Sequence, residues 1–110
     1  MVDKDVLNAC IAACSRCAAT CDYCSVACLE EDNVKEMVRC IRLDVDCANV
    51  CRLTAGALAR ESECLSTMAR ACAEVCQACG DECGKHDHTH CQDCARACKE
   101  CAELCRDIAA

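Results

Sequence analysis

Small apolar residues recur at alternating intervals of three and four positions along much of the chain, and nearly all charged residues lie between them. The clearest stretches are made of cysteine, at Cys10, Cys14, Cys17, Cys21, Cys24 and Cys28 in the first third and at Cys91, Cys94, Cys98, Cys101 and Cys105 in the last. Gaps of three and four place residues on one stripe of an α-helix, which is the pattern of a packed helical seam. The chain therefore has thiols at positions where leucine is usual.

Four helical segments follow from this pattern, at about residues 5–29, 33–60, 62–83 and 91–108. The expected N-caps are Asp3 or Asp5, Asn33 with Glu36 as its capping-box partner, and Ser62, and Gly84 is expected to end the third segment. Helices of similar length joined by a few residues predict an all-α fold, an antiparallel up-down-up-down four-helix bundle with a cysteine-lined core. At 110 residues the chain is expected to form a single domain, residues 1–110.

The composition indicates free thiols rather than disulfides. The chain has 19 cysteines, an odd number, together with three glycines and no proline. Small disulfide-rich secreted domains are rich in loops and pair their cysteines. The first residues show no secretory signal, and no stretch approaches the roughly 18 apolar residues of a membrane helix. We therefore expect a cytoplasmic protein with reduced thiols and no membrane partner.

The charge balance excludes other classes of partner. The net charge is −7, and the only aromatic residue is Tyr23. Nucleic-acid binding needs a basic surface and commonly uses aromatic stacking, so we expect no nucleic-acid partner. The sequence has no catalytic constellation, haem attachment motif or phosphate-binding loop, and we expect a protein that is not an enzyme.

Sixteen cysteines form eight Cys-x-x-x-Cys pairs. They are Cys10/Cys14, Cys17/Cys21, Cys24/Cys28, Cys47/Cys51, Cys72/Cys76, Cys79/Cys83, Cys94/Cys98 and Cys101/Cys105. On a helix, side chains four residues apart share a face, with Cβ atoms about 5–6 Å apart. Two thiolates that bind one ion linearly, with metal–sulfur bonds of about 2.3 Å, lie about 4.6 Å apart. The pairs therefore suit Cu(I), which thiolates select among first-row metals, and we expect multiple Cu(I) ions per chain.

The remaining cysteines, Cys40, Cys64 and Cys91, are further candidate metal ligands. Asp44 follows Cys40 by four residues, and we interpret it either as a ligand or gate or as a solvated residue near a helix end. Met68 follows Cys64 at the same spacing, and its thioether either binds Cu(I) or fills the core.

The two ends of the predicted bundle differ in chemistry. One end gathers apolar residues and a threonine into a plug, namely Leu7, Ile11, Thr54, Leu58, Leu65, Leu104 and Ile108. The other gathers Cys28, Met37, Cys40, Asp44, Cys83 and a connection with His86, His88 and His90. A histidine-rich tract beside cysteine is typical of metal binding, so we interpret this end as a mouth for copper uptake and release. His86 and His90 are favoured over His88, because a spacing of four places them on one face if the last helix starts early.

The chain resembles the bacterial copper storage proteins, specifically their cytosolic members without a signal peptide. The resemblance rests on the Cys-x-x-x-Cys pairs of all four segments, on A-C-A-E-V-C-Q-A-C-G-D-E-C from Ala71 to Cys83, and on K-H-D-H-T-H-C from Lys85 to Cys91. It covers essentially the whole chain. It implies a homotetramer of four-helix bundles whose cores fill with Cu(I) bound mainly by cysteine pairs, with a histidine-lined mouth. The cysteine-poor second segment and the additional Cys64 depart from the family pattern.

Two other metal chemistries remain as alternatives. A Zn or Cd thiolate buffer of metallothionein type would bind in groups of four thiolates, and each closed Zn²⁺ site would leave a charge of −2 in the core. One Cu⁺ in place of each thiol proton would instead keep the core neutral. An iron–sulfur electron carrier is the weaker alternative, because the cysteines after Cys91 are strung along a helix and lack the ferredoxin order.

Overall fold

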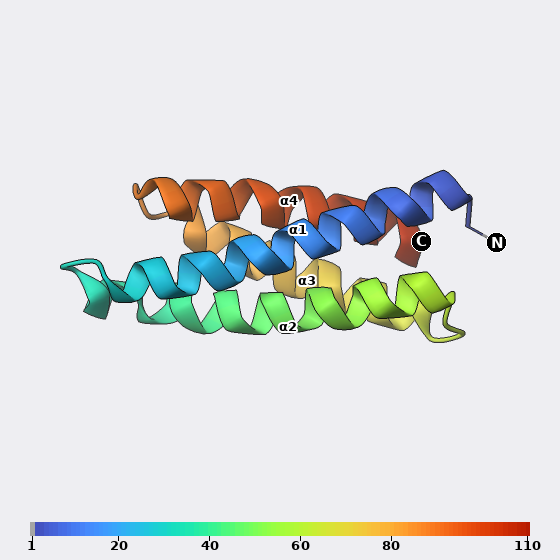
Figure 1. Ribbon diagram of the computed structural model, residues 1–110, viewed down its shortest axis with the longest axis horizontal. Coiled ribbons are helices and arrows are strands. Elements are labelled where there is room, and N and C mark those ends of the chain that lie inside the picture. The colour runs from blue at the N-terminus through green and yellow to red at the C-terminus, as the bar shows by residue number, and fades with distance from the viewer. Residues whose placement is uncertain (1) are drawn as a thin grey trace.

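A computed structural model describes residues 2–110 as four α-helices and one short 3₁₀ turn. They are α1 (Lys4–Leu29), η1 (Val34–Met37), α2 (Val38–Arg60), α3 (Leu65–Cys83) and α4 (Thr89–Ala109), as Figure 1 shows. Each α-helix packs against two neighbours, so that α1, α2, α3 and α4 form a closed ring. The bundle measures 48 × 18 × 18 Å. The predicted all-α, up-down-up-down architecture is confirmed.

The topology gathers two connections at one end of the bundle. The α1–α2 connection and the α3–α4 connection lie together at the left of Figure 1, and the two chain ends lie at the right with the α2–α3 connection. The left-hand end, which we call the mouth end, therefore combines residues 30–37 with residues 84–88. The opposite, closed end has Leu7, Thr54, Leu58 and Ile108 buried between the helices, as predicted for the plug, with Ile11, Leu65 and Leu104 partly buried beside them.

The first two helices begin with different chemistry. Asp3 is the N-cap of α1, and its Oδ1 accepts a hydrogen bond of 2.7 Å from the backbone N–H of Asp5. The predicted capping box at Asn33 is wrong. The Asn33 side chain donates to Glu36 Oε2 at 3.1 Å, and the residues that follow form the 3₁₀ turn before α2 begins at Val38. The tight turn returns the chain to the bundle within a few residues of the end of α1.

The third helix begins later than predicted, which moves Cys64 off the seam. Ser62 Oγ accepts from the backbone N–H of Cys64 at 3.0 Å, so the serine stabilises the turn before the helix, and α3 starts at Leu65. Glu61 ends α2 in the left-handed region with φ of 50°. Cys64 is consequently exposed at the N-cap position. The third helix ends at Cys83 and Gly84 follows it, as predicted.

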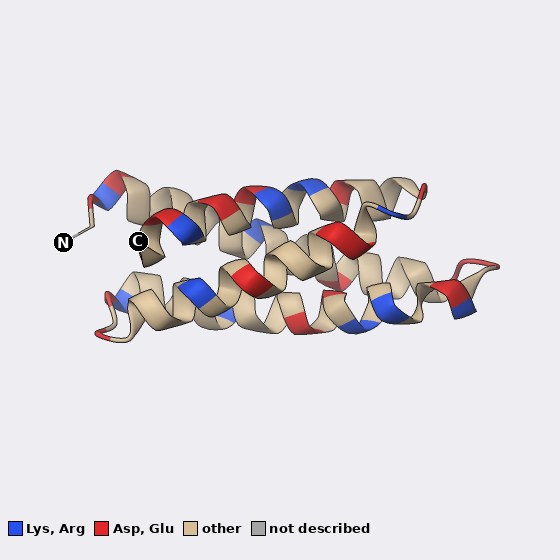
Figure 2. Cartoon of the chain, turned by 180° about the vertical axis from the view of Figure 1, so that it is seen from behind, with Lys and Arg blue, Asp and Glu red and all other residues tan. Residues whose placement is uncertain are grey.

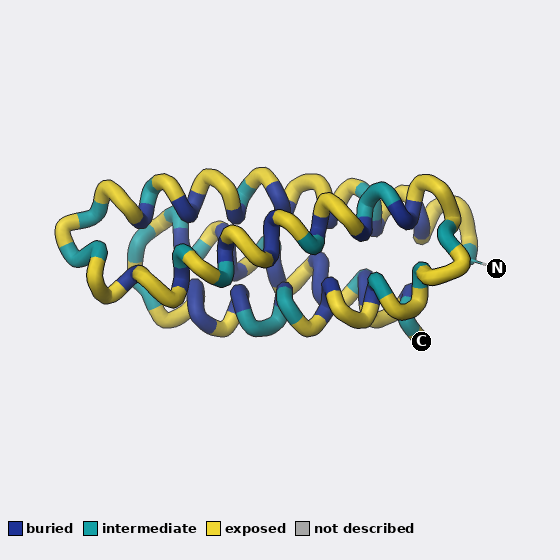
Figure 3. Tube along the Cα trace, turned by 90° about the horizontal axis from the view of Figure 1, so that it is seen from below, coloured by how far each residue is buried: buried dark blue, intermediate teal, exposed yellow. Residues whose placement is uncertain are grey.

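The core is made of thiols and alanines. Figure 3 shows the buried positions facing the bundle axis on every helix, and Figure 2 shows acidic and basic residues interspersed along the outside. Small residues between the cysteines let the helices approach closely. At Gly80, a Cβ atom would lie 3.2 Å from Cys98 Cβ, so even alanine is crowded where α3 meets α4. No helix in the described part of the chain is both long and apolar enough to cross a membrane.

Candidate metal centre

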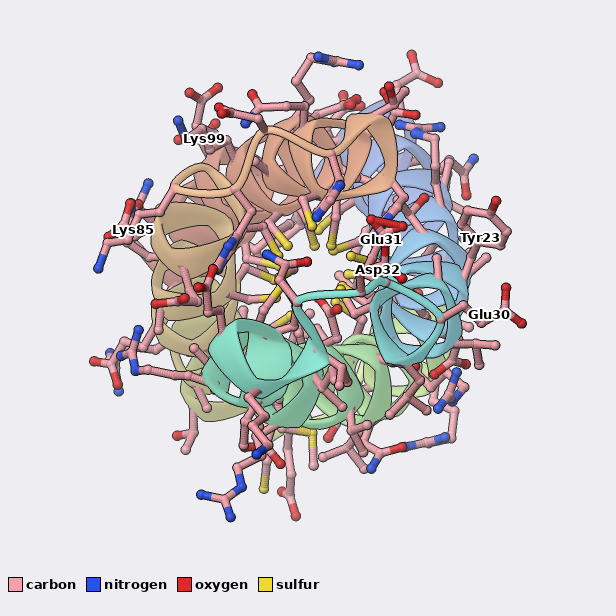
Figure 4. The ribbon with its side chains drawn as sticks, turned by 90° about the vertical axis from the view of Figure 1, so that its left-hand side faces the viewer. Tyr23, Glu30, Glu31, Asp32, Lys85 and Lys99 are labelled. Carbon is pink, nitrogen blue, oxygen red and sulfur yellow. The ribbon has the colours of Figure 1, made fainter. Side chains whose placement is uncertain are left out.

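A column of thiols runs through the whole bundle. Every cysteine except Cys64 is fully buried, and neighbouring sulfurs connect Cys10 and Cys105 near the closed end to Cys28 and Cys91 at the mouth end. Figure 4 looks into the mouth end and shows sulfur atoms lining the interior. The structure records all of these thiols as free.

Six of the eight predicted pairs have their sulfurs within 4.0 Å. The Sγ–Sγ distances are 3.9 Å for Cys17/Cys21, 3.8 Å for Cys24/Cys28, 4.0 Å for Cys47/Cys51, 3.9 Å for Cys72/Cys76, 3.9 Å for Cys79/Cys83 and 4.0 Å for Cys101/Cys105. These separations are shorter than the roughly 4.6 Å of a linear two-coordinate site. They are close to the roughly 4.0 Å that separates sulfurs around a three-coordinate ion with bonds of about 2.3 Å.

Contacts between helices are as short as those within a helix. Cys40 and Cys83 sulfurs lie 3.3 Å apart, and those of Cys47 and Cys76 lie 3.6 Å apart. These contacts bring cysteines together in groups of four whose sulfur atoms all lie within 4.8 Å of one another. They include Cys14, Cys72, Cys101 and Cys105, which we call the closed-end group, and Cys24, Cys28, Cys40 and Cys91, which we call the mouth group. Since Cys17, Cys21 and Cys101 each belong to two such groups, the arrangement suits thiolates that bridge neighbouring ions.

Burial favours the protonated form of two thiols at the mouth end, Cys28 and Cys91. Desolvation raises the pKa of Cys91 to about 11 and also raises the pKa of Cys28, since both sulfurs are removed from water. A negative charge on Cys40 raises both pKa values further, because a second thiolate beside it is unfavourable. Metal binding at such sites releases protons, so an exit for protons is part of the chemistry of the core.

Asp44 is a buried carboxyl inside the thiol column. Its Oδ1 accepts from the thiols of Cys94 at 3.2 Å, Cys79 at 3.3 Å and Cys83 at 3.4 Å, and its Oδ2 faces Cys40 at 3.9 Å. The side chain is fully buried, so the interpretation of Asp44 as a solvated residue is wrong. Desolvation, with the charges of Cys94 and Cys40, raises the pKa of Asp44 to about 8. A carboxyl in this position can accept a proton from a neighbouring thiol or bind a metal through oxygen.

His90 connects the thiol column to the mouth. Its Nδ1 lies 3.4 Å from Cys24 Sγ, 3.5 Å from Cys91 Sγ and 3.9 Å from Cys28 Sγ. Its Nε2 points the other way, is buried, and has no hydrogen-bond partner in the described part of the chain. An imidazole nitrogen among three thiols adds a donor of the kind that binds copper and zinc.

His88 lies against His90 and is held by the α1–α2 connection. The two rings stack with centroids 5.3 Å apart and an angle of 5° between their planes. Glu31 Oε2 lies 2.7 Å from His88 Nδ1, and Asn33 Oδ1 lies 3.3 Å from His88 Nε2. The sequence argument missed Glu31, because an acidic residue in a short polar connection normally faces water. The topology gives the missing signal, since it brings this connection to the same end as the histidines.

His86 takes a different position from the one predicted. Its Nε2 lies 2.8 Å from Glu82 Oε2, and Glu82 Oε1 also binds Arg39 at 2.6 Å. The expected pairing of His86 with His90 on one helical face is wrong, because α4 begins at Thr89 and His86 precedes it. His86 therefore belongs to an ionic cluster with Glu82, Arg39 and Lys85.

The Cys64/Met68 spacing does not produce a site in the core. Cys64 is exposed and Met68 is half-buried near the start of α3, outside the thiol column. Met37, in contrast, is fully buried at the mouth end, where Asn33 Nδ2 approaches its sulfur at 3.9 Å.

Comparisons with known proteins agree on one family. The model of the copper storage protein family, Csp, matches residues 3–110. YhjQ of Bacillus subtilis (strain 168), described as an uncharacterized cysteine-rich protein, is 49% identical over 103 residues, which cover 94% of this chain and 95% of YhjQ. The Cu(I)-bound copper storage protein BsCsp3 has a TM-score of 0.91 and 48% identity, over 96% of this chain and 99% of BsCsp3. A cytosolic copper storage protein from Streptomyces lividans, solved during copper loading with five coppers, has a TM-score of 0.92 and 42% identity, over 96% of this chain and 92% of that one.

Proposed function

Because the chain belongs to the copper storage protein family, we propose that it stores many Cu(I) ions at once inside its bundle, in the cytosol. The observation that carries this proposal is the column of buried, free thiols along the bundle, in which each sulfur lies 3.3–4.0 Å from at least one other and Asp44 joins the thiols of the two halves. A protein that transfers or senses a single ion needs only one small thiol group. A column of thiols along the length of the bundle can instead hold many ions at once.

The charge of the loaded core favours Cu(I) over divalent ions. Each buried thiol that exchanges its proton for Cu⁺ leaves the charge of the core unchanged. Each Zn²⁺ held by four thiolates leaves two negative charges in a low-dielectric interior, which costs several kcal/mol per site without compensation. Soft thiolates also bind Cu(I) preferentially among the first-row metals. Cysteine pairs within a helix, joined across helices by bridging sulfurs, are the proposed binding units.

We propose that copper passes through the mouth end. His90 Nδ1 is the outermost buried donor that faces the thiols, so an incoming ion meets His90 and the mouth group before the rest of the column. Asp44, with three thiols within 3.4 Å, is placed to exchange protons with those thiols as copper replaces them. The apolar residues of the closed end, Leu7, Leu58 and Ile108, block the opposite route.

We further propose that the protein is not an enzyme and that it assembles into a homotetramer. Large apolar side chains on the outer faces of α1 and α2 support assembly, because Val26, Leu29 and Leu53 are each more than half exposed. Sedimentation equilibrium of the reduced apo-protein tests this proposal. A mass of about 12 kDa, that of one chain, would contradict it.

The test of storage is an anaerobic titration of the reduced apo-protein with Cu(I) against a chromogenic Cu(I) chelator. Storage predicts about one copper per buried thiol, with little chelator complex formed before the plateau. A plateau at one or two coppers would contradict storage. A parallel Zn²⁺ titration that saturates tightly at about four or five ions, with weak Cu(I) binding, would favour the thiolate buffer instead.

A further inference from the structure

The α1–α2 connection brings one carboxylate to the two stacked histidines of the mouth. Glu31 lies two residues beyond the end of α1 and reaches residues at the start of α4. Its Oε2 lies 2.7 Å from His88 Nδ1, and its Oε1 lies 4.0 Å from His90 Nε2. Figure 4 shows Glu31 near the opening of the bundle, whereas its neighbour Glu30 points away into solvent.

The two nitrogens of His90 have different surroundings. Nδ1 faces the thiols of Cys24, Cys28 and Cys91, and Nε2 faces Glu31 from a buried position, without a hydrogen-bond partner among residues 2–110. A neutral imidazole carries one proton, and only the other nitrogen can bind a metal. The location of that proton therefore decides whether His90 presents a lone pair to the thiol column or to the connection.

We propose that Glu31 is a positioning residue that fixes the proton of His90 on Nε2 and leaves Nδ1 free to bind Cu(I) together with the mouth group. Histidines that bind metals commonly donate their second N–H to a carboxylate, which sets the tautomer and the ring orientation. This inference rests on the proposed copper function, and it adds the residue that prepares the outermost site. This role requires Glu31 Oε1 to move closer to His90 Nε2 than the 4.0 Å seen in the structure, because an N–H···O hydrogen bond spans about 3 Å.

His88 adds a steric part to the same arrangement. Oxygens of Glu31 and Asn33 lie beside its two nitrogens, and its ring lies flat against His90. The stack limits rotation of the His90 ring about its side-chain bonds. Glu82, a buried carboxylate at this end, cannot take this role, because it is already bound by Arg39, Lys85 and His86.

The experiment compares Glu31→Ala with Glu30→Ala in the full-length, reduced protein. Two-dimensional ¹⁵N NMR of the apo-protein reports the tautomer of His90. We expect the Nε2–H form in the parent and in Glu30→Ala, and a mixture of tautomers in Glu31→Ala. Glu31→Gln keeps an acceptor oxygen without the charge, so it is expected to restore part of the Nε2–H population.

Copper binding supplies the second measurement. In competition with a Cu(I) chelator, Glu31→Ala is expected to bind its outermost copper about 10- to 100-fold more weakly, the usual effect of losing such a partner, with total capacity unchanged. A His90 tautomer and a copper affinity that match the parent would overturn the inference, as would an equal effect of Glu30→Ala. A parent protein that takes up only one or two coppers would contradict the storage proposal, and the tautomer measurement would still decide the role of Glu31.

Discussion

The closed half and the mouth half of the core share one scaffold but differ in what surrounds the thiols. In the closed half, which contains Cys10, Cys14, Cys17, Cys47, Cys51, Cys72, Cys76, Cys98, Cys101 and Cys105, each hydrogen-bonding contact of a thiol within the described residues is with another thiol. In the mouth half, thiols also contact Asp44 and His90. The first arrangement provides capacity, and the second provides groups that exchange protons and capture ions.

The difference shows where a buried polar group is tolerated. A carboxyl or imidazole in an apolar core costs several kcal/mol unless hydrogen bonds compensate it. Asp44 has three thiol donors, and His90 lies close enough to the opening to face Glu31. Deeper in the column a polar group would also displace a thiol and reduce the number of ions stored.

The largest expected effect on copper capacity comes from replacing a set of four cysteines, either the closed-end group or the mouth group. Replacing the four cysteines of the closed-end group by serine, in one variant, is expected to lower capacity by about four coppers, because serine is not a soft ligand. The same replacement in the mouth group is expected to cost a similar number and also to slow uptake. Anaerobic Cu(I) titration gives capacity, and stopped-flow mixing with a Cu(I)–chelator complex gives the rate.

Because the two variants each lose four thiols, comparing their rates of copper uptake tests the route by which copper enters. Equal slowing in both variants would contradict uptake through the mouth end. Far-UV circular dichroism of each apo-variant establishes that the bundle is retained, because buried Cys→Ser changes leave the helices intact only if the new hydroxyls find acceptors.

Much of this core was predictable from spacing, because thiols every three or four residues on three of the four amphipathic helices have only the bundle interior to occupy. Spacing also placed Asp44 on the buried stripe, although it left open whether water reaches it. It failed at the ends of helices. Cys64 follows the periodicity, but its backbone N–H donates to Ser62 Oγ in a turn that precedes α3, so Cys64 lies outside the helix and the core. His86 and Glu31 lie in connections, whose geometry depends on partners from other elements.

The second prediction concerns Asp44, whose pKa is raised from 3.8 to about 8 in the apo-protein. The folded state therefore keeps a proton between these values that the unfolded chain has lost, so stability falls as pH rises from about 4 to 8. The slope is at most about 1.4 kcal/mol per pH unit. Asp44→Asn carries no charge and is expected to remove this slope.

Urea unfolding of both reduced apo-proteins at several pH values between 5 and 8 measures the effect. The groups that face this carboxyl are the thiols of Cys40, Cys79, Cys83 and Cys94. A slope that persists in Asp44→Asn would assign it to these thiols rather than to the carboxyl. A parent protein with constant stability across this range would show that water reaches Asp44.

A smaller effect is expected from the second buried carboxylate of the mouth end, whose pKa shifts the other way. Burial raises the pKa of Glu82, but hydrogen bonds from His86 and Arg39 and the charge of Lys85 lower it overall, below 4.5. Its ionic contribution is therefore present above pH 4.5 and is lost as pH falls. Arg39→Met is expected to destabilise the protein by about 1 kcal/mol at pH 7, since Arg39 is largely exposed and screened.

Unfolding in urea at pH 7 and at pH 3.5 tests this prediction, and Arg42→Met on the exposed side of the same helix is the control. The difference between parent and Arg39→Met is expected to shrink at the lower pH, because protonation of Glu82 removes the charge that attracts Arg39. A difference that stays constant would assign the effect to packing of the arginine side chain.

The smallest expected effect is on a cysteine that follows the sequence pattern but lies outside the core. Cys64→Ser is expected to leave copper capacity unchanged, because the Cys64 thiol is exposed and lies outside the column. Cys72→Ser, inside the helix that Cys64 precedes, is the matched control, and it is expected to cost about one copper because its thiol belongs to the closed-end group. Titration of the two variants side by side gives the comparison. Loss of a tightly bound copper in Cys64→Ser would mean that the loaded protein extends its site beyond the buried column, through Met68 or through a second copy of the chain.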